Sequence, residues 1–208
     1  VMDLALAVDK DGAFLALKVE GLGDMGAYLT AMGPWPVTNV VSRNLISVYK
    51  TPLFSYSTKC VFTNTVPTGP YRGAGRPESK FFLETLIDKA AAEIGIDRVE
   101  LRRRNFVRSN MFPHETPVGL VYDSGDFEAV MDEAMARADT MGFAARRAAS
   151  AAAGGSRRAA GIMVKRSGQP GCSSSPAPHP GRGRVKPERP WTPWRHCRQV
   201  STRAGESG

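Results

Sequence analysis

The sequence has few cysteines and histidines, and they show no spacing that would organise a fold. Cys60, Cys172 and Cys197 form no Cys-x-x-Cys pair, and the three histidines form no matching cluster. This excludes a disulfide framework and a zinc site of the usual spacing. Cys60 lies in an alternating apolar run, which predicts a buried thiol.

Long hydrophobic runs are also missing. No stretch of about 18 apolar residues is present, so no segment is expected to span a membrane. The first eight residues lack the basic region of a secretory signal, and their apolar run breaks at Asp9. A cytoplasmic protein is therefore the expectation.

Acidic and large apolar residues are scarce in the C-terminal part. Residues 1–150 hold 17 Lys and Arg against 18 Asp and Glu, whereas residues 151–208 hold 11 against 2 and contain no Leu, Phe, Tyr, Asp or Asn. The formal net charge of +8 therefore comes from this tail. Because such a segment cannot build a core, residues 151–208 are predicted to be a disordered basic tail.

The pattern along residues 1–150 predicts an α+β fold, with a hairpin and strands followed by helices. Two apolar stretches, residues 1–7 and 13–19, flank an Asp-Gly turn, which is typical of a β-hairpin. Strands are also expected at residues 45–49 and 59–65, where β-branched and aromatic residues concentrate. Three helices are expected from capping residues and apolar spacing, at residues 77–94, 98–105 and 127–138.

Several residue patterns that resemble functional sites are explained more simply by ordinary structure. The glycine-rich residues 21–26 lack the strand–helix context of a phosphate loop and predict an irregular connection. Asp123 and Asp126 suit a turn and a helix cap rather than a metal site. His114 is a lone loop histidine. Three consecutive arginines, residues 102–104, are expected to form ion pairs on a solvated helix face.

The strongest candidate for a binding segment precedes the first of these helices. It reads Tyr71-Arg72-Gly73-Ala74-Gly75-Arg76. Glycine permits close approach of a backbone to a ligand, while amides, a helix N-terminus and guanidinium groups favour an anion. The residue types support an anionic cofactor or substrate and a plain capping turn equally.

With this loop, four further segments resemble the molybdopterin-binding large subunit of the xanthine dehydrogenase and aldehyde oxidase family. The similarity is greatest to the bacterial group known as carbon monoxide dehydrogenase large chains of the second form. It covers residues 1–150 and implies a partial molybdopterin-binding domain. The four segments are Ile87-Asp88-Lys89-Ala90-Ala91, Gly95-Ile96-Asp97, Glu100-Leu101-Arg102-Arg103-Arg104-Asn105 and Tyr122-Asp123-Ser124-Gly125-Asp126.

The resemblance implies a molybdenum hydroxylase, which oxidatively hydroxylates an aldehyde or an N-heterocycle with water as the oxygen source. It implies molybdopterin cytosine dinucleotide as the cofactor, with iron–sulfur clusters on a small partner subunit and FAD on a medium one. Residues 71–76 would bind the cofactor, and Arg72 would stabilise negative charge at the metal centre. No residue of this chain is implied as a metal ligand.

Three departures from the family pattern limit what the resemblance implies. Carbon monoxide oxidisers place a copper-binding cysteine where Gly73 stands, which argues against that substrate. Xanthine oxidisers place an aromatic residue where Ala74 stands, so a purine is no more favoured than an aldehyde. The family's general-base glutamate has no counterpart, so the chain is expected to be a fragment that is inactive alone.

The tail allows two interpretations. Its composition is typical of GC-rich coding sequence translated in a shifted frame, which fits the end of the family resemblance near residue 150. The alternative is a nucleic-acid-binding or interaction protein, although no known binding module is present. In that case basic side chains would contact phosphates and two tryptophans would stack on bases. These residues are Arg182, Arg184, Lys186, Arg189, Trp191, Trp194, Arg195 and Arg198.

Overall fold

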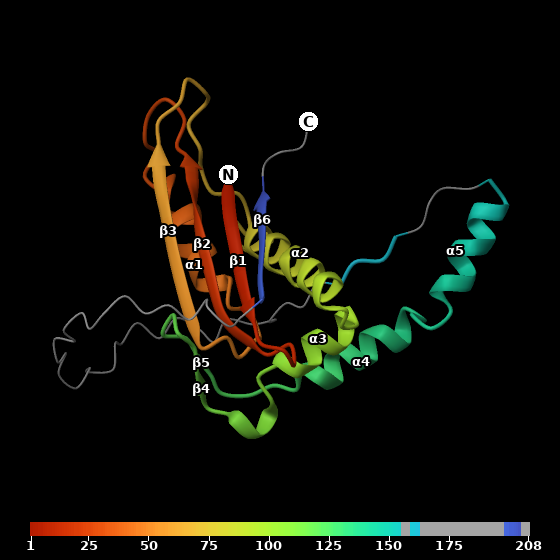
Figure 1. Cartoon of the computed structure of the whole chain (residues 1–208). Coiled ribbons are helices and arrows are strands. Elements are labelled where there is room, and N and C mark those ends of the chain that lie inside the picture. The colour runs from red at the N-terminus through yellow and green to blue at the C-terminus, as the bar shows by residue number, and fades with distance from the viewer. Residues whose placement is uncertain (155–158, 163–197, 205–208) are drawn as a thin grey trace.

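The computed structural model describes residues 1–154, 159–162 and 198–204, and a four-stranded sheet forms its centre (Figure 1). The strand order is β3-β2-β1-β6, and a separate two-stranded sheet pairs β4 with β5. The strands are β1 (Met2–Val8), β2 (Phe14–Asp24), β3 (Leu53–Val61), β4 (His114–Glu115), β5 (Val121–Tyr122) and β6 (Arg198–Ala204). The helices are η1 (Pro36–Val40), α1 (Val41–Asn44), α2 (Arg76–Ile94), α3 (Arg98–Asn105), η2 (Ser109–Met111), α4 (Phe127–Arg137) and α5 (Phe143–Ala152).

The predicted hairpin is confirmed as β1 and β2, which pair in antiparallel register. Gly12 has a positive φ of 84° in the turn, and the Asp9 carboxylate accepts hydrogen bonds from two turn amides at 2.9 and 2.8 Å. β2 continues to Asp24 and so includes Gly21 and Gly23. These glycines therefore do not form a phosphate loop, and the predicted irregular connection is wrong for residues 21–24, which are part of the strand.

The two remaining strand predictions were less successful. β3 begins at Leu53, before the predicted start at residue 59, and runs parallel to β2. Residues 45–49 form no strand, because they turn after α1 and contribute only a single bridge from Tyr49 to Phe106. All five are buried. Their β-branched and aromatic side chains therefore signal burial in the core rather than a place in a sheet.

The three predicted helices are confirmed as α2, α3 and α4. Gly95 ends α2 in the left-handed conformation with φ 73°, as expected for a glycine after a helix. The Asp97 carboxylate caps α3 by accepting the amides of Val99 and Glu100 at 2.8 and 3.0 Å. Asp126 caps α4 through the amide of Ala129.

The hydrophobic core fixes α2 against the sheet. The cross-strand pairs Leu4–Val19 and Leu6–Leu17 belong to the same buried cluster as residues 83–91 of α2. Burying each such side chain contributes about 1.5–3 kcal/mol. Because α2 is held in this way, the loop at its N-terminus has a defined place at the end of the sheet.

A buried polar network connects α2 with α3. The Arg102 side chain is 0% exposed, and its Nε and Nη1 donate to Glu84 Oε2 at 2.9 Å and to Asp88 Oδ1 at 2.7 Å. The Tyr49 hydroxyl donates to the same Glu84 carboxylate at 3.1 Å. Burial, followed by the negative charge of Glu84, raises the pKa of Tyr49 well above its ordinary value, so Tyr49 remains a donor.

The predicted solvated face is therefore correct for only two of the three arginines. Arg103 pairs with Asp132, and Arg104 pairs with Glu100 within one helix turn. Both arginines are partly exposed. Arg102 points instead toward α2, because three consecutive residues of a helix face different directions.

Two expectations about exposure and order need correction. Cys60 is exposed near the end of the edge strand β3 and is not a buried thiol. Residues 151–152 belong to α5, and residues 198–204 form β6 antiparallel to β1, although composition predicted that residues 151–208 form a tail without structure. The rest of residues 163–208 lies outside the described part. No described helix is long and apolar enough to cross a membrane.

Candidate functional site

Residues 71–76 form a tight turn that leads into α2. The amide of Ala74 donates to the carbonyl of Tyr71 at 2.8 Å, and the amide of Arg76 donates to that of Gly73 at 2.9 Å. Gly73 and Gly75 have φ values of 87° and 82°. Only glycine adopts this left-handed backbone readily, so the two glycines account for the shape of the turn.

The two glycines have different surroundings. A Cβ on Gly75 would lie 2.8 Å from the carbonyl oxygen of Pro36 and 2.8 Å from Cβ of Val40. Gly75 therefore fixes the end of the turn directly against η1. A Cβ on Gly73 would meet nothing closer than Pro77 at 3.9 Å. The turn is thus anchored at Gly75 and open at Gly73.

Arg72 is the exposed cation of this loop. Tyr71 beside it is 88% exposed, and Arg72 makes no ion pair with any described residue. The sequence suggested free amides here, but those of Ala74 and Arg76 bond within the turn, and Pro77 has none. An anion at this loop would therefore not be bound by these two amides, whereas the exposed Arg72 guanidinium is available to it.

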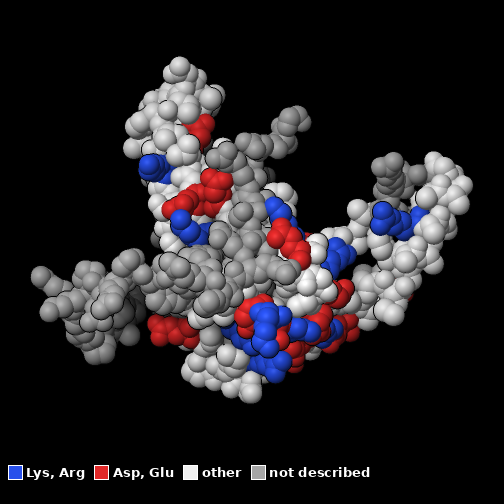
Figure 2. Space-filling model, in the orientation of Figure 1, with Lys and Arg blue, Asp and Glu red and all other residues white. Residues whose placement is uncertain are grey.

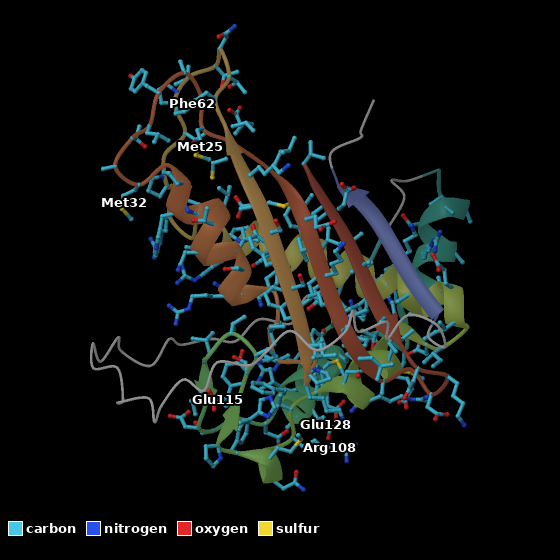
Figure 3. The ribbon with its side chains drawn as sticks, turned by 60° about the vertical axis from the view of Figure 1, so that its left-hand side comes forward. Met25, Met32, Phe62, Arg108, Glu115 and Glu128 are labelled. Atoms are coloured by element: carbon cyan, nitrogen blue, oxygen red, sulfur yellow. The ribbon has the colours of Figure 1, made fainter. Side chains whose placement is uncertain are left out.

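An uncharged surface, here called the tip, continues from the loop. It comprises residues 25–35 and 62–71, which include no charged side chain. Figure 2 shows the upper end of the molecule almost without acidic or basic side chains, and Figure 3 places Met32 and Phe62 there. Phe62 is 63% exposed and Val66 is 84% exposed. Exposed apolar side chains grouped in this way indicate an interaction region.

The charged surface lies at the other end of the molecule, where both signs are mixed around α3 and α4 (Figure 2). Arg108 and Glu128 face each other there at 3.9 Å (Figure 3). This surface is not a basic patch suited to nucleic acid. The arginines and tryptophans of the nucleic-acid alternative lie outside the described residues, except that Arg198 begins β6.

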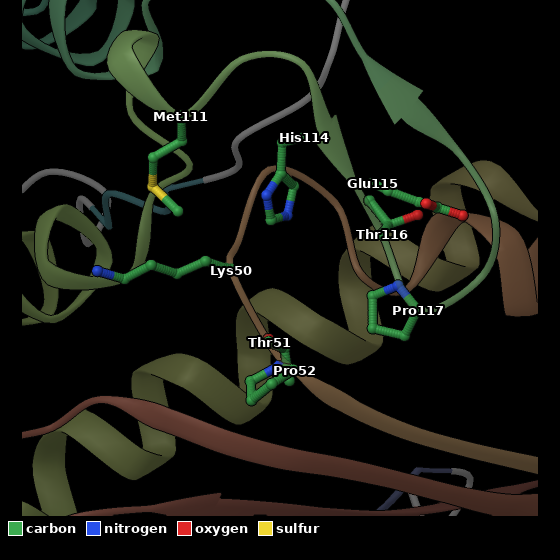
Figure 4. A pocket seen from close by; sticks show the side chains of 8 residues that line it. All are labelled: Lys50, Thr51, Pro52, Met111, His114, Glu115, Thr116 and Pro117. Carbon is green, nitrogen blue, oxygen red and sulfur yellow. The ribbon is translucent and has the colours of Figure 1, made fainter.

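A cavity of about 520 Å³ lies between the segment before β3 and the β4 segment (Figure 4). His114 points into it, and its floor includes the buried Thr51 and Thr116. It adjoins the first residue of β3, whereas residues 62–70, which lead to the Arg72 loop, follow the last, and no residue of the loop lines the cavity. The cavity is therefore separate from the loop.

Asp123 and Asp126, which lie just before α4, have structural roles, as expected. Asp126 caps α4, and Asp123 accepts the hydroxyl of Ser124 at 3.1 Å. Among the residues that the structure describes, no three His, Cys, Asp or Glu side chains are grouped so that they could hold a metal ion.

Comparison with known proteins covers the part of the chain that contains the β1–β2 hairpin, the parallel strand β3 and helix α2. The profile of the molybdopterin cofactor-binding domain family matches residues 1–106, slightly more than half of the chain. The gamma subunit of the 6-hydroxypseudooxynicotine dehydrogenase complex of Paenarthrobacter nicotinovorans is 35% identical over 144 residues. This match covers 67% of the chain and 18% of that subunit.

Two further relatives agree. The carbon monoxide dehydrogenase large chain of Hydrogenophaga pseudoflava is 32% identical over 150 residues, which cover 71% of the chain and 19% of that protein. The structure of quinoline 2-oxidoreductase from Pseudomonas putida 86 matches with a TM-score of 0.63 at 35% identity, covering 72% of the chain and 19% of the other. The chain thus spans about a fifth of the length of these relatives. The chain belongs to the molybdopterin-binding large subunits of the xanthine dehydrogenase and aldehyde oxidase family, and represents part of such a subunit.

Proposed function

We propose that residues 1–150 are part of the molybdopterin-binding domain of a molybdenum hydroxylase, and that residues 71–76 contact its cofactor. The observation that carries this proposal is the exposed Arg72. Its guanidinium lacks an ion-pair partner among the described residues and stands beside the open glycine turn at Gly73. A guanidinium group binds anionic oxygen through paired hydrogen bonds.

The residues present fit an anionic cofactor. Gly73 leaves room for close approach, because a Cβ there meets no atom nearer than 3.9 Å. Within residues 71–76, Arg72 and Gly73 would lie nearest the cofactor, and the contact of Gly75 with η1 would also keep the turn in place. When bound, the molybdenum cofactor supplies the two-electron oxidation chemistry. We propose molybdopterin cytosine dinucleotide as its form, by analogy with the family.

The proposed reaction is the hydroxylation of an aldehyde or an N-heterocycle. A substrate C–H bond is replaced by a C–O bond whose oxygen comes from water, and two protons and two electrons are released. We propose that the electrons pass to iron–sulfur clusters and FAD on partner subunits. Relatives are named for quinoline and nicotine oxidation, which supports an N-heterocycle. Gly73 cannot ligate copper, which argues against carbon monoxide.

Arg72 would act through its charge. A fixed cation stabilises negative charge that develops during a reaction, and the loss of one such group typically lowers the rate about 10²–10³-fold. In a complete relative such as quinoline 2-oxidoreductase, changing the arginine that matches Arg72 to alanine is therefore expected to slow substrate-dependent reduction of the enzyme by that order. Anaerobic stopped-flow absorbance measures this rate. Lysine at the same position should recover part of the reduction rate. An unchanged rate in the alanine variant would contradict the proposal.

The proposed general base lies on a part of the large subunit that this chain does not include. The purified 208-residue chain is accordingly expected to hold no molybdenum and to oxidise neither an aldehyde nor quinoline. Elemental analysis by mass spectrometry and a dye-reduction assay test both expectations. Stoichiometric molybdenum in the isolated chain would contradict the view that further segments are needed.

A further inference from the structure

The segment before the Arg72 loop is attached to the fold by the turn that follows β2. Residues 62–70 belong to no helix or strand. The amides of Thr63 and Thr68 donate to the carbonyls of Gly26 and Met25 at 3.0 and 3.3 Å, and the amide of Ala27 donates back to the carbonyl of Thr65. These hydrogen bonds explain how an irregular segment can have a defined path.

The Asp24 carboxylate lies at the centre of this attachment. It accepts the amide of Gly26 at 2.8 Å and the hydroxyls of Thr63 and Thr65 at 2.7 and 3.3 Å. The backbone carbonyl of Asp24 also accepts the hydroxyl of Thr68 at 3.2 Å. The Gly26 amide and then the Thr63 hydroxyl lower the pKa of Asp24, so that the side chain remains an ionised acceptor.

Glycine makes the contact between the turn and the segment close. Gly26 has a φ of 71°, and a Cβ there would lie 2.4 Å from the carbonyl oxygen of Val66. The two backbones therefore touch with no room for a side chain. Gly75 is equally fixed on η1, whereas a Cβ on Gly69 would meet nothing within 4 Å. Residues 69–74 are thus an open arc between two fixed points.

We propose that Asp24 is a positioning residue for Arg72. Its carboxylate holds Thr63 and Thr65 against the turn and so limits where the segment leading to the arc can lie, while the contact at Gly75 sets where the arc ends. The consequence for the cofactor rests on the proposed function. The attachment itself is a property of this chain and can be tested without any cofactor.

Amide hydrogen exchange of the full chain, resolved by residue with NMR, tests the inference. Asp24→Ala should speed exchange of the Thr63 amide roughly fivefold, the scale of one lost hydrogen bond. Exchange of the Ala74 amide within the arc should also accelerate. Amides of α2 serve as the internal reference and should keep their rates.

Matched variants separate positioning from general support of the fold. Asp24→Asn keeps one acceptor oxygen and should restore most of the slow exchange, whereas Thr63→Val should reproduce part of the loss. Glu20→Gln changes a carboxylate on the same strand that pairs with Lys18 at 2.9 Å. This control should leave residues 63–74 unaffected.

Two results would overturn the inference. Unchanged exchange at Thr63 and Ala74 in Asp24→Ala would show that the carboxylate does not hold the arc, and equal acceleration in α2 would show that it supports the whole fold. Arg72→Ala should leave all these rates unchanged. The exchange results could agree with the prediction while the arginine variant of the relative keeps its reduction rate. That outcome would support the attachment by Asp24 and contradict the proposed function.

Discussion

Replacing Arg102 by alanine is expected to lower the free energy of unfolding by about 3–5 kcal/mol, because it leaves a buried carboxylate without its cation. Arg102 is fully buried, and Glu84 is only 5% exposed beside it. A domain of this size is stable by only about 5–15 kcal/mol. Urea denaturation followed by circular dichroism should therefore show a large shift of the midpoint.

Two comparisons make the Arg102 prediction specific. Arg104→Ala removes an exposed ion pair with Glu100 in the same helix and a hydrogen bond to the Asp11 carbonyl, and should cost only about 1–2 kcal/mol. Arg102→Met combined with Glu84→Leu and Tyr49→Phe removes both charges and the hydroxyl that would lose its acceptor, and should recover much of the lost stability, since apolar side chains can replace a buried ion pair. If Arg102→Ala costs no more than Arg104→Ala, the buried network contributes little.

Gly75→Ala is expected to destabilise the chain by about 1–2 kcal/mol through its left-handed backbone and by about 1–3 kcal/mol more through overpacking. The second contribution arises because the new methyl group would approach Pro36 and Val40 at 2.8 Å. The same urea titration measures the change. Because this contact anchors the turn before α2, the variant should also displace the Arg72 loop.

Gly73→Ala is the matched control for Gly75→Ala. Gly73 has nearly the same positive φ, 87° against 82°, but an open environment. Gly73→Ala should therefore be destabilised only by its left-handed backbone conformation. The difference between the two variants isolates the contact with η1. Equal destabilisation would mean that this contact is unimportant.

Local signals in the sequence predicted those elements whose ends are defined by neighbouring residues. The Asp-Gly turn indicated the hairpin, and Asp97 and Asp126 marked the starts of α3 and α4 through capping. Each of these features involves residues within four positions of one another. Such short-range interactions can be inferred without knowledge of the fold.

Features that depend on distant residues could not be inferred in the same way. Residues 45–49 resemble a strand by composition but are buried around the bridge from Tyr49 to Phe106. Cys60 lies in an apolar run yet is exposed near the end of β3, the edge strand of the sheet. Whether a side chain is buried depends on which distant residues pack against it. A local sequence pattern does not contain that information.

The sequence alone determined the family resemblance, the α+β class, the capped helices and the choice of residues 71–76 as the candidate loop. The tertiary structure decided that Arg72 is exposed while Arg102 is buried, that Gly75 is fixed against η1, and that Asp24 attaches the segment leading to the loop. Capping and turn formation join residues close in sequence. Asp24 and Thr63, by contrast, meet only because β2 and β3 run parallel and end together.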